Sequence, residues 1–148
     1  MTLETRIRWL KIGAVITIGF GLLIAAAAMP ALQAPIALLT DLIFYPLDGG
    51  PAIGSPGERL LSAITGGVMA GWGVMMYLAA TEVLPKDPMT GRRLILAAIG
   101  TWFVIDSSMS VAAGAPLNVV GNLSFLLIFV LPVWSLRASD PEMKAQET

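Results

Sequence analysis

One carboxylate, Asp106, is the only charged side chain in the apolar segment 94–113. A carboxylate inside a membrane-spanning helix is energetically costly and therefore marks a candidate functional residue. The next apolar segment, 117–136, contains Asn118 and Asn122, which are four residues apart and so share one face of a helix. Because amide N–H groups donate hydrogen bonds to carboxylates, the two segments carry complementary polar groups.

Spacing about Gly114, which lies between these two segments, predicts which polar side chains meet. Asp106 is eight residues before Gly114, and Asn122 is eight residues after it. Ser110 and Asn118 are each four residues away from Gly114, on opposite sides. Antiparallel helices joined there place the members of each pair at the same depth. We therefore expect these four side chains to form one polar cluster within the membrane.

The predicted cluster has two interpretations. In the first, it is a small site for a proton, a cation or the head group of a ligand. In the second, it is an interhelical clasp in which the asparagine amides hydrogen-bond the carboxyl group. The sequence favours the clasp, because no intramembrane base accompanies Asp106 to form a proton path.

Composition indicates an integral membrane protein built only from α-helices. Of 148 residues, 56% are hydrophobic and 13% are charged, and the mean hydropathy is +0.79. A typical soluble domain has about 25% charged residues. Each of four apolar segments is long enough to cross a bilayer core of about 30 Å. They predict one domain, residues 1–138, whose four transmembrane helices form two antiparallel hairpins, with spans at about 10–29, 60–81, 94–113 and 117–136.

The basic residues predict the orientation of these spans. Eight of the nine fall on one side of the predicted topology, and only Arg59 falls on the other. Because cytoplasmic loops are enriched in Lys and Arg, both termini are expected to be cytoplasmic. The sequence thus indicates a multipass protein of the bacterial inner membrane, with residues 139–148 as a cytoplasmic tail.

The first outer loop, residues 30–58, contains five of the ten prolines. Within it, residues 35–45 are mostly apolar but too few to span a membrane, so we expect a short interfacial or re-entrant helix. Three residues resemble helix N-caps, namely Thr2, Ser55 and Asp87.

Two further sets of residues suggest contacts. A stripe of small residues at four-residue intervals allows close helix packing, either inside the bundle or against another protein. Its members are Gly13, Thr17, Gly21 and Ala25 in the first span and Gly67 and Gly71 in the second. A set of methionines and aromatic residues provides a possible lipid or quinone contact, although core packing is the more common role of such residues. This second set is Met69, Trp72, Met76, Trp102 and Phe103.

The chain contains no histidine and no cysteine. It therefore lacks the usual ligands for haem and zinc and the usual activating base for a serine nucleophile. The net charge of −1 gives no basic surface for nucleic acid. These features predict a protein that is not an enzyme and has no metal or other cofactor, apart from a possible lipid or quinone contact.

The leading functional hypothesis is an accessory or assembly subunit of a larger membrane complex, possibly an energy-transducing one. Its expected partners are membrane lipids and other membrane subunits. The first alternative is a small oligomeric transporter or channel subunit that uses the polar site at Asp106, Asn118 and Asn122. A weaker alternative is a protein that binds a lipid or a quinone.

Overall fold

The computed structural model describes residues 1–49 and 52–136, and all regular secondary structure in this part of the chain is helical. The predicted tail, residues 139–148, lies outside it. In chain order the elements are α1 (Leu3–Ala26), the 3-10 helix η1 (Pro30–Leu32), α2 (Ala34–Ile43), α3 (Pro56–Leu78), the π-helix η2 (Ala79–Val83), α4 (Pro88–Ala112) and α5 (Asn118–Trp134). The prediction of an all-α protein is therefore confirmed for the described residues.

Among the described residues, three helical segments are long and apolar enough to cross a membrane. They are α1, the continuous segment Pro56–Val83 that joins α3 to η2, and α4. The predicted fourth span, 117–136, is the shorter apolar helix α5 of 17 residues, whose length is about 25 Å. α1 and the Pro56–Val83 segment begin several residues before the predicted spans, because capped polar turns extend them at their N-termini.

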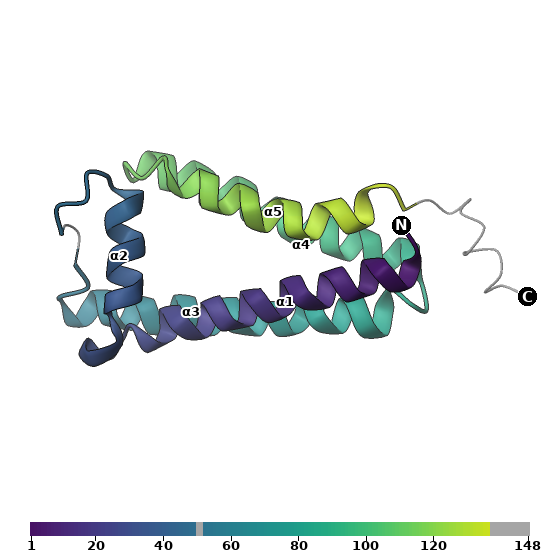
Figure 1. Cartoon of the computed structure of the whole chain (residues 1–148), viewed down its shortest axis with the longest axis horizontal. Helices are drawn as coiled ribbons and strands as arrows, with labels where there is room; N and C mark the ends of the chain where they lie inside the picture. The colour runs from purple at the N-terminus through teal and green to yellow at the C-terminus, as the bar shows by residue number, and fades with distance from the viewer. Residues whose placement is uncertain (50–51, 137–148) are drawn as a thin grey trace, which may run out of the picture.

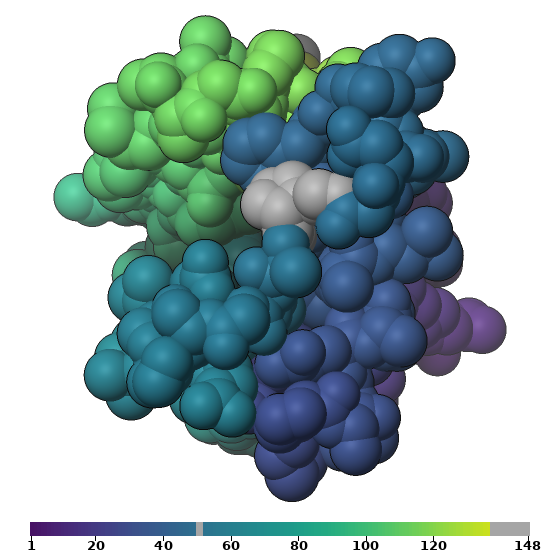
Figure 2. Space-filling view, turned by 90° about the vertical axis from the view of Figure 1, so that its left-hand side faces the viewer, coloured from purple at the N-terminus to yellow at the C-terminus, as the bar shows by residue number. Residues whose placement is uncertain are grey.

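The long helices form two pairs (Figure 1). α1 packs along α3, and α4 packs along α5, to which it is joined by a short turn containing Gly114 at a φ of +81°. The pairs lie close together where α1 begins, which we call the N-terminal end. They diverge toward the opposite end, where α2 stands across the gap between them (Figure 1). We call this the α2 end, and Figure 2 shows α2 beside the tip of the α4–α5 pair.

The predicted N-caps are confirmed. Thr2, Ser55 and Asp87 each accept a hydrogen bond from a backbone N–H in the first turn of α1, α3 and α4 respectively. At α3 the bond is reciprocal, since the Glu58 carboxylate accepts from the Ser55 N–H at 2.7 Å. These caps satisfy amide groups that have no partner within the helix, and they fix where each helix begins.

α1 and α3 approach so closely that the glycines in their contact have no room for a side chain. A Cβ atom on Gly21 would lie 2.5 Å from the backbone nitrogen of Ala70. A Cβ atom on Gly66 would overlap the backbone of Gly21 and Ala25. Both of these α1 residues belong to the predicted stripe. The contact face of α3 therefore runs through Gly66 and Ala70.

The predicted pair Gly67 and Gly71 does not lie in this contact. Both glycines are exposed, and a Cβ atom on either would have no neighbour within 4 Å. Packing within the bundle is therefore the wrong interpretation for this pair. Successive residues of a helix point about 100° apart, so Gly66 faces α1 whereas Gly67 faces away from it. In α1, by contrast, Gly13, Thr17 and Gly21 are all buried.

We predict that Gly66→Ala destabilises the protein and that Gly67→Ala does not. Both changes increase helix propensity by about 1 kcal/mol, so the difference between them measures the α1–α3 contact. Overpacking at Gly66 should lower the free energy of unfolding by about 1–3 kcal/mol relative to Gly67→Ala. The measurement is unfolding by SDS in mixed micelles, and equal stability of the two variants would contradict the close contact.

A buried arginine joins the two helix pairs at the N-terminal end. The Arg6 side chain of α1 is 5% exposed and donates hydrogen bonds to the carbonyl oxygen of Pro132 and to the hydroxyl of Ser135. Arg92 of α4 donates from Nε to the carbonyl oxygen of Val133 at 3.1 Å. The last carbonyl groups of a helix lack intrahelical partners and carry partial negative charge. Two guanidinium groups therefore stabilise the C-terminus of α5.

Replacement of Arg6 by methionine should destabilise the fold, because the Pro132 carbonyl group would lose its charged donor in a buried place. Hydrogen bonds to charged groups contribute about 1.5–3 kcal/mol each, so we expect a loss of at least about 2 kcal/mol. Arg8→Met is the matched control, since Arg8 is exposed on the same helix. SDS unfolding checks the difference, and similar losses in the two variants would refute it.

Candidate functional site

A cavity of about 970 Å³ lies between the two helix pairs, toward the α2 end. All five α-helices contribute to its walls. Most lining side chains are aliphatic or aromatic, among them Phe20, Leu39, Val68, Trp72, Trp102 and Phe125. Apart from the tryptophans, four polar side chains reach it, namely Thr65, Asp106, Asn118 and Asn122. The cavity is thus apolar, with its polar groups supplied mainly by α4 and α5.

The polar cluster is centred on Asp106. Its Oδ1 atom accepts hydrogen bonds from Asn122 Nδ2 at 2.6 Å, from Asn118 Nδ2 at 3.1 Å and from Ser110 Oγ at 3.2 Å. The structure thus brings together the four side chains that the spacing about Gly114 placed at matching depths. It adds Ser107, whose hydroxyl oxygen accepts from Asn122 Nδ2 at 3.1 Å. Ser107 is adjacent to Asp106, but nothing in the spacing singled it out.

The hydrogen bonds to Asp106 are unevenly distributed between its two carboxyl oxygens. All three go to Oδ1, and Oδ2 accepts none from the described residues. In the same part of the chain, no buried side-chain nitrogen or oxygen lacks a hydrogen-bond partner. Oδ2 is therefore accessible rather than enclosed. Asp106 is one of the residues that line the cavity, and Oδ2 is its carboxyl oxygen without a hydrogen bond from the described residues.

Aromatic rings from four helices pack together beside the cavity. Trp72 of α3 lies 5.5 Å from Trp102 of α4, measured between ring centroids, and 6.0 Å from Phe129 of α5. Phe125 of α5 lies 5.6 Å from Phe20 of α1 and 6.2 Å from Trp102. Such ring pairs stabilise packing beyond their buried area. They form the continuous contact between the two helix pairs that bounds the cavity.

The predicted lipid or quinone contact set is divided by the structure. Met69, Trp72 and Trp102 line the cavity. Met76 belongs to the core and is 3% exposed. Phe103, on α4, is half-buried and does not line the cavity. Sequence spacing identified the tryptophans but could not show which of their neighbours share the same space.

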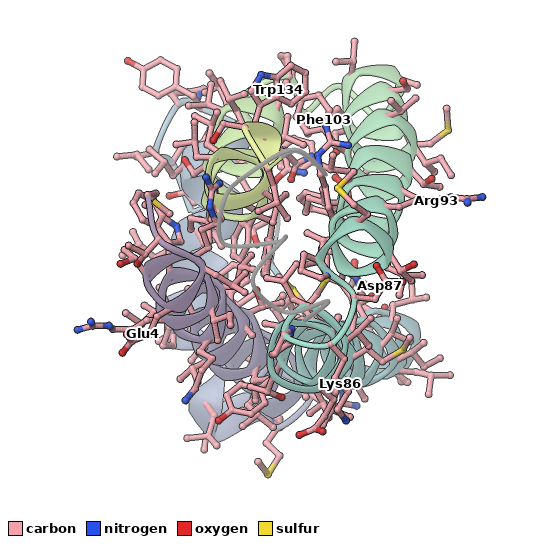
Figure 3. All side chains as sticks on the ribbon, turned by 90° about the vertical axis from the view of Figure 1, so that its right-hand side faces the viewer. Glu4, Lys86, Asp87, Arg93, Phe103 and Trp134 are labelled. Atoms are coloured by element: carbon pink, nitrogen blue, oxygen red, sulfur yellow. The ribbon has the colours of Figure 1, made fainter. Side chains whose placement is uncertain are left out.

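Several charged side chains at the N-terminal end, unlike the buried Arg6, lie on the outside of the bundle. Figure 3 shows this for Glu4, Lys86, Asp87 and Arg93. Hydrogen bonds from the hydroxyl and the backbone N–H of Thr90 lower the pKa of Asp87 below its ordinary value. These groups are solvated and stabilise helix ends, so they are not candidates for a site.

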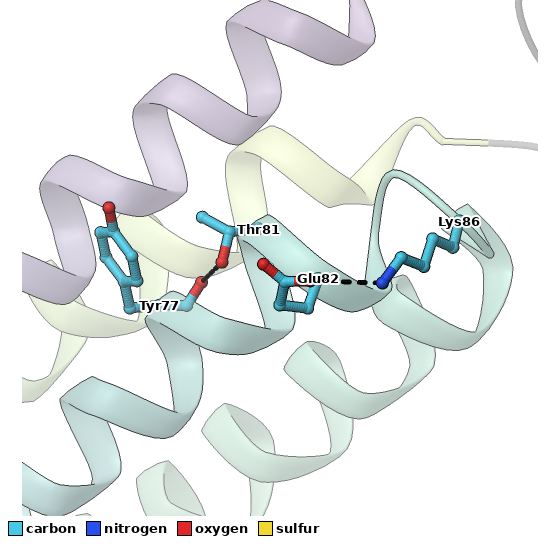
Figure 4. A network of polar contacts seen from close by, with 4 residues as sticks. All are labelled: Tyr77, Thr81, Glu82 and Lys86. Atoms are coloured by element: carbon cyan, nitrogen blue, oxygen red, sulfur yellow. Dashed lines mark hydrogen bonds and ion pairs between the residues drawn. The ribbon is translucent and has the colours of Figure 1, made fainter.

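The π-helix η2 ends the α3 segment at the same end of the molecule (Figure 4). There Thr81 donates a hydrogen bond to the carbonyl oxygen of Tyr77 at 3.0 Å, and Lys86 pairs with Glu82 at 3.2 Å. Both members of the ion pair are more than 60% exposed. Exposed pairs of this kind contribute at most about 1 kcal/mol. The network therefore shapes a helix end and is separate from the cavity.

The site is chemically suited to binding. It contains one carboxylate, two amides and hydroxyl groups, but no histidine or cysteine. No group of three acidic residues that could hold a metal ion occurs among the residues that the structure describes. Comparison of the chain with models of protein families, with curated proteins and with solved structures finds no match.

Proposed function

We propose that this chain is a multipass membrane protein that binds an amphiphile of the lipid class in the cavity between its helix pairs. One observation carries the proposal, namely an apolar cavity of about 970 Å³ lined by a single carboxylate, Asp106, one oxygen of which has no hydrogen bond from the described residues. Ligand pockets are generally apolar, measure about 300–1,000 Å³ and have few polar groups that orient the ligand. An elongated apolar molecule with one polar head group matches this arrangement.

The proposed topology has four spans, with α5 as the fourth and both termini in the cytoplasm of a bacterial cell. Its support is the pairing of α5 with α4 and the distribution of the basic residues. Trp9 and Trp134, both exposed at the N-terminal end, match the aromatic belt of a membrane interface. The α2 end then faces outward, and α2 lies near the outer interface. Asp106 is six residues from the end of α4, which places it about 9 Å inside that surface.

A transport function is less well supported than binding. An ion path needs polar groups along its length, whereas the polar side chains of this cavity are concentrated on one wall. Asp106 also has no basic residue beside it in the cavity lining. The same features suit a bound amphiphile, whose chain contacts the apolar walls while its head group reaches the carboxylate.

Replacement of Gly121 by phenylalanine should prevent binding. Gly121 lines the cavity, and a Cβ atom there has no neighbour within 4 Å, so the ring can enter the space without a backbone clash. Gly19→Phe is the matched control, because Gly19 has equally open surroundings but lies outside the cavity. We expect purified wild type and Gly19→Phe to retain a stoichiometric amphiphile, detected by mass spectrometry, and Gly121→Phe to lose most of it. Equal retention by all three would contradict the proposal.

A second candidate function is that of an accessory subunit, which is favoured by the exposed glycines of α3. Gly67 and Gly71 present a small-residue face with no neighbour in the described chain. In membranes, small residues four positions apart let the backbone of another helix approach closely. On this proposal α3 packs against a subunit of a larger membrane complex through that face, while the cavity remains on the inner side of the same helix.

The accessory-subunit proposal predicts that Gly71→Leu weakens partner binding and leaves the fold intact. Leucine at this position would hold the backbones of two helices apart, whereas Gly19→Leu provides an exposed control on α1. The measurement is purification in a mild detergent followed by mass spectrometry of the complex. We expect a stoichiometric membrane partner that Gly71→Leu loses and Gly19→Leu retains. Wild-type protein that purifies as a lone monomer or as a homo-oligomer would exclude this function.

A further inference from the structure

The polar wall of the cavity is formed by Asp106, Asn118 and Asn122. The side-chain N–H groups of both asparagines already donate hydrogen bonds within the protein. Each asparagine amide has two N–H groups. Asn122 Nδ2 donates to Asp106 and to Ser107, and Asn118 Nδ2 donates to Asp106 and to Ser110. The Ser110 hydroxyl donates its hydrogen to Asp106 as well. None of these three groups keeps a hydrogen for a ligand.

What the wall offers instead is an acceptor. Asp106 lines the cavity, and its Oδ2 atom accepts no hydrogen bond from the described residues and is not fully buried. A carboxylate oxygen takes up hydrogen-bond donors. A head group that has only acceptor atoms, such as a ketone or a carboxylate, therefore finds no free donor among Asn118, Asn122 and Ser110. The other donors of the cavity, the indole N–H groups and the Thr65 hydroxyl, lie outside this cluster. A head group with N–H or O–H groups does find an acceptor in the cluster.

The charges around the cavity also indicate which kind of donor head group it would bind. Asp106 is the only ionisable side chain among the lining residues, and no lysine or arginine neutralises it there. A carboxylate within a membrane segment is stabilised by a cationic partner. Trp102, which also lines the cavity, is four residues from Asp106 on the same face of α4. Because an indole ring attracts cations, carboxylate and ring together favour a positively charged donor.

We infer that the cavity selects an amphiphile whose head group is a protonated amine, which donates a hydrogen bond to Asp106 Oδ2 while the apolar chain lies against the aromatic walls. This inference rests on the proposed binding function and specifies its ligand class. It assigns the asparagines a positioning role, since they fix the carboxylate so that one oxygen faces the helix contact and the other faces the ligand.

The test uses the tryptophans of the cavity as reporters. In a Trp9→Phe/Trp134→Phe background the chain retains only Trp72 and Trp102, both of which line the cavity. Four brominated probes of one chain length are titrated into the protein in detergent micelles, and bromine quenches the tryptophan fluorescence. The probes are a primary alkylamine, an alkyl trimethylammonium salt, an alcohol and a fatty acid. Quenching in the same background with Gly121→Phe gives the contribution of partition into the micelle.

The expected result is saturable quenching in which the primary amine binds about tenfold or more tightly than the alcohol, because a charge-assisted hydrogen bond is about twice as strong as a neutral one. The trimethylammonium probe should bind less tightly than the amine, since it has charge but no N–H donor. The fatty acid should bind most weakly. These comparisons need no change at Asp106.

The second part of the test repeats the probe titrations with Asp106→Asn. The amide can keep Oδ1 as the acceptor for Asn118 and Asn122 while an uncharged Nδ2 replaces Oδ2, so the preference for the amine should disappear. Ser108→Ala, an exposed position on the same helix, should retain it. An amine preference that survives in Asp106→Asn would overturn the inference, and so would equal binding of all four probes or tighter binding of the fatty acid. If no probe quenches above the Gly121→Phe baseline, the proposed binding function fails as well.

Discussion

The fold depends on the junction at which α1 meets the end of α5. There the Arg6 guanidinium group, buried between the two helix pairs, hydrogen-bonds the Pro132 carbonyl group. A helix that ends away from water must find donors for its last carbonyl groups. Arg6 and Arg92 supply them from α1 and α4. This junction fixes the two pairs at one end, and their contact continues through the ring cluster of Trp72, Trp102 and Phe129 as far as Phe20 and Phe125.

Beyond that cluster the pairs separate, and the separation creates the cavity. α1 remains attached to α3 because the glycine contact at Gly21 and Gly66 leaves no space between their backbones. α5 remains attached to α4 through the hydrogen bonds to Asp106. Each pair is therefore held together by its own short-range contact. Neither contact depends on side chains that would fill the space between the pairs. α2 stands across this space at the α2 end (Figure 1), and Leu39 of α2 is part of the cavity lining.

The features that the sequence predicted well are local in the chain. The cluster about Asp106 follows from equal spacing on either side of Gly114, and the caps at Ser55 and Asp87 follow from their own first turns. Features that depend on the direction of a helix face were not predictable. All sides of these helices are apolar, so no pattern distinguished Gly66, in the contact, from Gly67, outside it. Arg6 indicated orientation as one basic residue among several, and its buried role depends on a helix end 126 residues away.

The clasp and the binding site, which the sequence posed as alternatives, use the same hydrogen bonds. Asn118 and Asn122 hold α5 to α4 by donating to Asp106 Oδ1, and this contact alone would make the cluster structural. Donation to one oxygen, however, fixes the orientation of the carboxyl group and leaves the other oxygen without a hydrogen bond from the described residues. It also uses the amide hydrogens that would otherwise attract an acceptor. The contact that stabilises the helix pair therefore also determines which hydrogen-bonding groups the polar cluster has left over.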